Sequence, residues 1–432
     1  MQTEIKKITD VEYDLEINAA SADLATEIDQ AIHTQRGRTT MKGFRAGKVP
    51  TAMVRKMYGK SLAYGIAEER VQNTFKSVVL DSKDYEVLGQ PVITDIEYEF
   101  EGDLKAVVRF GVRPEIKIED LSKAKVFRLV HEVTDEDVQK EIEILLGQHA
   151  ELTPVDGPAK ADSYVIVDMQ RLDDKGKKPE GDVQKDVPFL LSDDNLIPEL
   201  KKALTGLKVG KTKKVTFPGM DGHDDRYFEV TLNEVKRRDL PELDDEMVKK
   251  VTNDQVENPD ALRTQIREQL ISGWDQRSNE LFQSDSIEKL IGLHQFNVPG
   301  SVVEMYLDAF VKDAADKNKT KKLPADFDVE GFKDSRRAQA ESQARWMFIR
   351  DAIVAEQSLE VSEEDHEAHF EKMAAQGGFG ADMMKSYYKS MPQLMDQMEQ
   401  GIISEKVFTY LGENMKVVEK DKDAYEKEMK KG

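Results

Sequence analysis

The spacing of apolar residues changes along this chain, and that change most restricts the folds it can adopt. Between residues 164 and 235, apolar and polar residues alternate in short runs, which is the two-residue period of half-buried strands. From residue 259 onwards, apolar residues recur at helical spacing, as at Leu262, Ile266 and Leu270. A chain of 432 residues is too long for one hydrophobic core and indicates about three domains. The sequence therefore predicts a multidomain α+β protein.

Residues 1–113 predict a compact α+β domain in which a loop joins two helices. Its expected elements are a strand within 2–18, a helix from Ser21, a helix over 51–82 with a break at Gly59, and a hairpin of 92–100 and 104–113. The next residues, 114–153, are expected to form a connector with a strand at 125–131 and a helix capped by Thr134 and Asp137.

Two further domains follow the connector. Residues 154–240 predict a small β-rich domain of four strands around one short helix. Residues 241–432 predict an all-α domain. Its expected helices begin after Asn258-Pro259 and Pro299, and others cover 330–358, the residues after Ser362, 381–390 and 393–412. The last dozen residues alternate in charge and are expected to be frayed.

One stretch of this acidic chain contains no acid. The whole sequence has a net charge of −21, and its 84 acids in 432 residues would place about seven in residues 30–67, which hold none. The basic residues of this stretch are Arg36, Arg38, Lys42, Arg45, Lys48, Arg55, Lys56 and Lys60. We call this segment the basic island, and its charge favours an anionic partner.

At the centre of the island, residues 43–50 read Gly-Phe-Arg-Ala-Gly-Lys-Val-Pro. Two glycines permit a tight turn, so Phe44 is expected at an exposed loop tip between cations. This stretch resembles the ribosome-docking signature of the bacterial trigger factor family. The match covers Gly43, Phe44, Arg45, Gly47, Lys48 and Pro50, and family members often carry lysine where this chain has Ala46. The resemblance implies docking on the large ribosomal subunit near the exit tunnel.

The β-rich segment resembles the prolyl isomerase domain of FK506-binding-protein type that trigger factors contain. The resemblance rests on residues 195–200, 206–210 and 215–218. Such an enzyme needs apolar and aromatic walls that favour the twisted amide, and several are replaced here, at Met169, at residues 179–182, at Leu200 and in the loop after Pro218. The remaining candidates for the pocket are Met169, Phe189, Leu196, Ile197, Leu200 and Phe228. The fold is therefore expected with weak or absent isomerase activity.

Methionine is concentrated near the C-terminal end. Seven of the chain's 17 methionines fall between Met373 and Met415, where an even spread would place about two. Flexible, polarisable side chains suit surfaces that accept many apolar shapes, although the same residues also fill helical cores. In trigger factors the C-terminal helices form arms that hold unfolded and nascent chains. The residues expected to bind such clients are Met373, Met383, Met384, Tyr387, Met391, Met395 and Met398.

Several chemistries are disfavoured by the sequence. There is no cysteine, no phosphate-binding loop motif and no third ligand pattern beside His366 and His369, so we expect no cofactor, metal or nucleotide. The sequence has no apolar run of membrane length and no signal-peptide core, which favours the cytoplasm.

Three functions remain: an ATP-independent ribosome-docked chaperone, a prolyl isomerase free of the ribosome, and an RNA-binding protein that uses the basic island. A homodimer away from the ribosome is also left open. The chaperone hypothesis is preferred because it accounts for every expected domain, whereas each alternative accounts for one.

Overall fold

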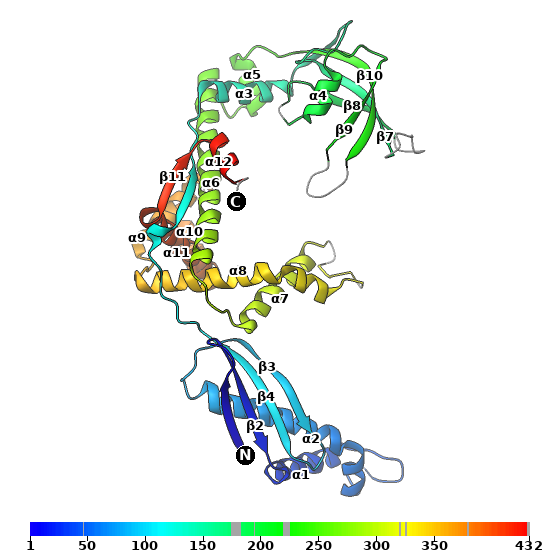
Figure 1. The fold of residues 1–432 in the computed structure, drawn as a ribbon, viewed down its shortest axis with the longest axis vertical. Coiled ribbons are helices and arrows are strands. Elements are labelled where there is room, and N and C mark those ends of the chain that lie inside the picture. The colour runs from blue at the N-terminus through cyan, green and yellow to red at the C-terminus, as the bar shows by residue number, and fades with distance from the viewer. Residues whose placement is uncertain are drawn as a thin grey trace. The chain divides into compact units, whose positions relative to one another are not determined.

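The computed structural model describes residues 1–45, 47–173, 183–193, 195–218, 225–318, 321–324, 326–377 and 380–429. Contacts divide the chain into two compact units (Figure 1). The first unit comprises residues 1–129 and 279–432, and the second comprises residues 130–278.

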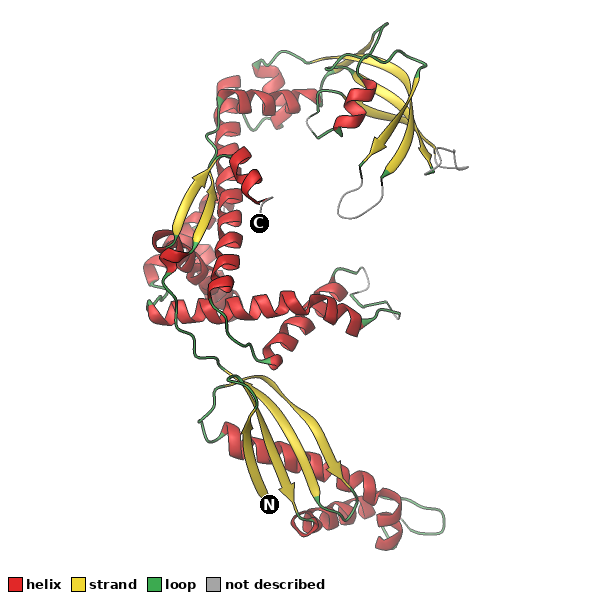
Figure 2. Ribbon diagram, viewed as in Figure 1, coloured by secondary structure: helices red, strands yellow, loops and turns green. Residues whose placement is uncertain are grey.

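The N-terminal part of the first unit is an antiparallel sheet covered by two helices (Figure 2). Its strand order is β1-β2-β4-β3. The elements are β1 (Gln2–Lys7), β2 (Glu12–Ala19), α1 (Ser21–Arg38), α2 (Thr51–Phe75) with a π-helical turn (Lys76–Leu80), β3 (Val87–Tyr98) and β4 (Leu104–Val112). Alternate residues of β2 and β4, such as Leu15, Ile17 and Val108, face the buried side against Leu24 of α1 and Val71 of α2. This confirms the expected α+β domain and its hairpin.

The expected break at Gly59 is wrong. Helix α2 passes through this residue without interruption. A Cβ atom at Gly59 would lie 2.9 Å from the ring of Phe100, so the glycine allows this aromatic ring to approach the helix. The residue serves packing and does not interrupt the helix.

The C-terminal part of the first unit is mainly helical, as expected. Its elements are the last part of α6 (Pro259–Leu293), α7 (Gly300–Asp316), α8 (Val329–Glu356), α9 (Glu363–Gly377), α10 (Ala381–Lys389) and α11 (Pro392–Asn414). Phe282 of α6, Ile349 of α8 and Leu411 of α11 belong to one buried cluster. Helices α7 and α8 pack on each other around Val303, Leu307 and Ala340.

The described residues near the C-terminus form regular structure up to residue 429, so the expectation that the last dozen residues are frayed is wrong for those among them that the structure describes. Strand β11 (Lys416–Lys420) pairs in parallel with β5 (Lys125–Leu129), and helix α12 (Lys422–Met429) follows. Tyr425 of α12 is buried, and the ammonium groups of Lys125 and Lys420 lie 4.9 and 4.2 Å from the ring centroid of Phe127. The sequence pattern does not predict this strand, because charged residues make part of its packing: the two lysines lie over an aromatic ring.

The second unit contains a five-stranded sheet and several helices. Its strand order is β6-β10-β7-β8, with β9 also paired to β10. The elements are α3 (Asp135–Gly147), β6 (Glu151–Pro154), β7 (Tyr164–Leu172), β8 (Val183–Leu190), α4 (Pro198–Leu204), β9 (Thr212–Phe217), β10 (Arg226–Asp239), α5 (Asp245–Thr252) and the first part of α6. Strand β6 was not predicted, because it is short and ends in a proline at a sheet edge.

The helices of the second unit pack in a different grouping from the one that the sequence predicts. Val138 and Ile142 of α3 share a buried cluster with Val248 of α5 and Leu262 and Ile266 of α6. Residues 241–278 therefore pack with the connector, whereas the sequence pattern grouped them with the C-terminal helices. Within the part of the chain that the structure describes, no helix has the length and hydropathy needed to cross a membrane.

Candidate functional site

The loop between α1 and α2 turns sharply at the basic motif. The backbone amide of Phe44 donates to the carbonyl of Met41 at 3.0 Å, and these two residues form a β-bridge. Gly43 lies between them with φ of +96°, a conformation that residues with a side chain rarely adopt. Met41 packs against the domain core, whereas the Phe44 side chain is 40% exposed. The turn thus holds an aromatic ring in solvent on an anchored backbone.

The second half of the loop is fixed to the helices on either side. The Arg36 side chain of α1 donates from Nε to the carbonyl of Val49 at 2.9 Å, and Val49 is fully buried. The amide of Lys48 donates to the carbonyl of Arg45 at 2.9 Å, and Gly47 makes the intervening turn with φ of +73°. Ala46 lies outside the described residues. The exposed side chains of Arg45 and Lys48 therefore project from a backbone that is held at both ends.

The basic residues of the island serve two purposes. Arg36 supports the loop, and Arg55 forms ion pairs with Asp29 and Glu101. The others are exposed at the surface: Arg38, Lys42, Arg45, Lys48, Lys56 and Lys60. Counting all eight cations therefore overstates the charge that the island offers to a partner.

The candidate isomerase residues lie in or beside the core of the second unit. Met169 and Leu200 are buried in it, and Phe189, Leu196 and Phe228 pack at its edge. The ring centroid of Phe228 lies 4.8 Å from that of Phe217. The sixth candidate, Ile197, is exposed. The structure thus brings five of the six together as packing residues.

Other parts of the expected isomerase pocket, residues 179–182 and the loop that follows Pro218, lie outside the described residues. A cavity of about 440 Å³ in this unit is lined by other side chains, including Lys160, Ser192 and Arg237, and by none of the six candidates.

The C-terminal methionines divide into a buried and an exposed set. Met398 is buried with Phe370 and Ile402, and Met384 and Met395 pack against this cluster. Met373 is half-buried. On α10 and the residue that precedes α11, Met383, Tyr387 and Met391 are exposed and follow one another at intervals of four residues. We call these three residues the α10 ridge.

A capping interaction fixes α9, against which α10 packs. The amide and hydroxyl of Ser362 donate to Asp365 Oδ2 at 2.7 and 2.8 Å, as the sequence predicted for the start of this helix. Lys406 of α11 donates to the same oxygen at 2.6 Å. The hydrogen bond from Lys406 and those from Ser362 lower the pKa of Asp365 to about 2.

We expect Asp365→Asn to lower the thermal stability of the protein near neutral pH. A carboxyl whose pKa is depressed by folding stabilises the fold above its unfolded pKa, and it loses this contribution as pH falls through the folded value of about 2. The difference in Tm between native protein and variant should therefore shrink from pH 5 towards pH 2. Glu364→Gln removes an exposed carboxylate of the same helical turn and is the control. A difference that persists unchanged to pH 2 would contradict the assignment.

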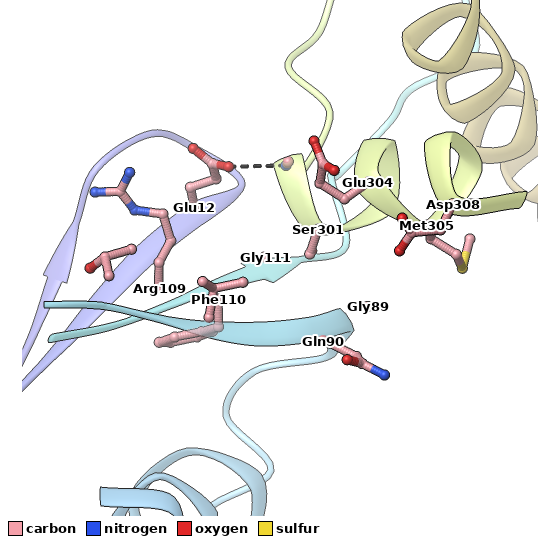
Figure 3. A pocket seen from close by; sticks show the side chains of 13 residues that line it. Glu12, Gly89, Gln90, Arg109, Phe110, Gly111, Ser301, Glu304, Met305 and Asp308 are labelled. Carbon is pink, nitrogen blue, oxygen red and sulfur yellow. Dashed lines mark hydrogen bonds between the residues drawn. The ribbon is translucent and has the colours of Figure 1, made fainter. Parts of the chain in front are cut away.

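The start of α7 meets the N-terminal sheet beside a cavity of about 550 Å³ (Figure 3). The amide of Gly300 donates to Glu12 Oε1 at 3.0 Å, and the Ser301 hydroxyl donates to the carbonyl of Leu88 at 2.6 Å. A Cβ atom at Gly111 of β4 would lie 2.5 Å from Pro299 Cβ and 2.6 Å from Ser301 Oγ. The sequence does not predict this contact, because it joins β4 and the start of α7, which lie far apart in the chain and carry no recognisable motif.

Comparison with known proteins agrees with the motif in the α1–α2 loop. The family described as "Bacterial trigger factor protein (TF)" matches residues 1–145, and its C-terminal region matches residues 260–413. A trigger factor of Salinibacter ruber is 41% identical, over 98% of this chain and 96% of its own length. The chain belongs to the trigger factor family. This confirms the resemblance seen in the motif and, with it, membership of a chaperone family.

More distant trigger factors match over a similar length. The trigger factor of Chloroherpeton thalassium is 28% identical, over 96% of this chain and 97% of its own. A solved structure described as "Promiscuous Substrate Recognition in Folding and Assembly Activities of the Trigger Factor Chaperone" is 22% identical, with a TM-score of 0.47, and covers 95% of this chain and 99% of that one.

Proposed function

We propose that this chain is an ATP-independent chaperone that docks on the large ribosomal subunit near the exit tunnel and shields apolar segments of newly made proteins. The observation that carries the docking proposal is the anchored turn that holds Phe44 in solvent, followed by the exposed side chains of Arg45 and Lys48. An exposed aromatic anchor on a rigid loop loses little conformational freedom on binding, and the neighbouring cations attract phosphates.

The α10 ridge supports the proposal of client binding. Met383, Tyr387 and Met391 expose apolar surface, whereas Met398 and Met395 belong to the packing beneath it. An exposed row of flexible apolar side chains can contact unfolded segments without selecting one sequence. Met384, Met395 and Met398 thus support the ridge in this proposal, and the three exposed residues contact the client. Met373, which is half-buried, stays a predicted client contact.

Co-sedimentation with purified ribosomes tests the docking proposal. The double variant Phe44→Ala, Arg45→Ala should bind at least about ten-fold more weakly, because it loses the aromatic anchor and one phosphate contact. A matched control is Lys208→Ala, Val209→Ala, which removes one exposed cation and one exposed apolar side chain from the second unit. Equal binding of the double variant and the native chain would refute docking through this loop.

Isomerase activity is proposed to be weak or absent. Leu200 stands where the related enzymes have an aromatic residue, but it is only 1% exposed and belongs to the core. Leu200→Phe is therefore expected to overpack the core, lowering the free energy of unfolding by about 1–3 kcal/mol, without a gain in turnover of a prolyl peptide. Ile197→Phe adds an aromatic ring at an exposed position and controls for its mere presence. Turnover that rises at least ten-fold in Leu200→Phe would overturn the proposal.

Two remaining expectations stay predictions. Location in the cytoplasm is checked by fractionation of cells. A homodimer away from the ribosome is checked by sedimentation velocity over a range of protein concentrations, since its population must rise with concentration.

A further inference from the structure

All the sulfur in this chain is thioether sulfur. The sequence has 17 methionines and no cysteine, so any redox chemistry of its sulfur takes place at methionine. Peroxides convert methionine to its sulfoxide, and an oxidant in solution reaches exposed sulfurs first. Six methionines are exposed among the side chains that the structure describes: Met1, Met53, Met57, Met305, Met383 and Met391.

Two of these exposed sulfurs lie on the α10 ridge, above methionines that are covered. The side chains of Met383 and Met391 are 64% and 44% exposed. Met384 and Met395 instead pack against a cluster that contains the buried Met398. A limited dose of oxidant should therefore convert the two ridge sulfurs before the sulfurs that pack between helices.

The attachment of α10 to its neighbours does not depend on the ridge sulfurs. Lys385 Nζ of α10 lies 2.8 Å from Glu363 Oε1 and 3.5 Å from Glu367 Oε1, both on α9. The ring of Tyr388 meets the ring of Phe370 edge to face, with 5.5 Å between their centroids. Oxidation of the ridge should thus change its surface while these contacts hold α10 in place.

A sulfoxide changes what the ridge can bind. It replaces an apolar atom by a strong dipole that holds water, and covering this dipole with apolar surface costs free energy. Tyr387 follows Met383 and precedes Met391 at intervals of four residues. Both ends of the ridge would therefore become polar, and Tyr387 alone would keep its apolar surface.

We propose that Met383 and Met391 form a reversible oxidation site through which hydroperoxides weaken the binding of clients. This inference rests on the client binding proposed above. In the reaction, the thioether sulfur takes one oxygen of hydrogen peroxide, the O–O bond breaks, and the second oxygen leaves as water with both hydrogens. The sulfur is oxidised by two electrons and the peroxide is reduced by two. Methionine sulfoxide reductases A and B together reverse the change.

The test treats the full chain with increasing doses of hydrogen peroxide, which catalase then removes. Peptide mass spectrometry should find sulfoxides at Met383 and Met391 at doses that leave Met384, Met395 and Met398 unchanged. At such a dose, the dissociation constant for labelled, reduced and carboxymethylated α-lactalbumin should rise about three- to ten-fold. Tm should stay the same, because the buried thioethers are intact. Treatment with both reductases should restore the original dissociation constant.

Two double variants assign the effect to the ridge. Met383→Leu, Met391→Leu keeps apolar side chains that peroxide does not oxidise, so the ratio of its dissociation constants after and before oxidation should be about one. Met53→Leu, Met57→Leu is the matched control, since these methionines are 43% and 54% exposed on α2. Its ratio should equal that of the native chain. Each variant is compared with its own unoxidised form, so a change in its basal affinity does not affect the result.

The outcomes separate this inference from the chaperone proposal. If the native chain carries both sulfoxides and binds the unfolded probe as before, the inference falls, although the chaperone proposal stands. A ridge variant that loses as much affinity on oxidation as the native chain overturns it too, as does conversion of the buried methionines before the ridge. If the unoxidised chain does not bind the probe, client binding and this inference both fall.

Discussion

Replacing Phe282 with alanine is expected to lower the free energy of unfolding of the first compact unit by about 3–5 kcal/mol. The ring is 2% exposed and belongs to the cluster that joins α6, α8 and α11. The guanidinium of Arg128 lies 4.5 Å from the ring centroid, so the variant loses a cation–π contact as well as buried area. The cavity would open where β5 meets α6, beside the buried Asp285 that accepts a hydrogen bond from the amide of Phe127.

Tryptophan fluorescence during urea unfolding can measure this loss of stability in the first compact unit. The chain has two tryptophans, of which Trp346 stacks on Phe408 in the first unit. Trp274 lies in the second unit, so a Trp274→Phe background leaves one reporter. Phe282→Leu should lose less than half as much stability, because it refills most of the volume. Glu288→Ala, at an exposed position of the same helix, should change stability by no more than about 0.5 kcal/mol. If Phe282→Ala unfolded at the same urea concentration as the native chain, the structural role of the ring would be contradicted.

Gly111→Ala is expected to disturb the contact between β4 and the start of α7 at a cost of about 1–3 kcal/mol. The added methyl group would overlap Pro299 and Ser301, at 2.5 and 2.6 Å. Neither neighbour yields easily, since one is a proline ring and the other is held through its hydroxyl to Leu88. The segment 299–301 should therefore leave the sheet.

Hydrogen exchange at the amide of Gly300 reports this separation, because this amide donates to Glu12 in the native structure. Exchange should become faster in Gly111→Ala, and Tm should fall. Gly65→Ala is the control: no atom lies within 4 Å of the position that its added methyl group would take, and in the interior of α2 alanine should stabilise by up to about 1 kcal/mol. The two alanine variants should thus shift Tm in opposite directions. If the Gly300 amide exchanged as slowly in Gly111→Ala as in the native chain, the sheet would have accommodated the methyl group.

Features set by neighbouring residues could be predicted from the sequence. The capping pairs Thr134–Asp137 and Ser362–Asp365 form as their spacing indicates, because both partners lie within one helical turn. The tight turn at Gly43 follows from its freedom at positive φ. The cationic, acid-free segment is equally a property of the sequence, and together with the motif it indicates the family from residue types alone.

Features set by distant neighbours could not be predicted. The sequence pattern predicted a helix break at Gly59, but the ring of Phe100 decides the role of this glycine. Arg55 counts as a free cation of the island in the sequence, yet Asp29 and Glu101 neutralise it. The exposure of Met53, Met57 and Tyr64 on α2 is likewise a tertiary feature.

The sequence by itself determined the family, the change from strand-rich to helical segments and the place of the Gly-Phe-Arg motif, since each depends on residue types at short spacing. The tertiary structure decided which apolar side chains are core and which are surface. Met398 and Met383 belong to the same cluster of methionines in the sequence, but only one is buried. It also decided that the last strand pairs in parallel with β5 from a distant part of the chain. The physical reason is that burial and strand pairing depend on contacts between segments far apart in sequence, which no local pattern records.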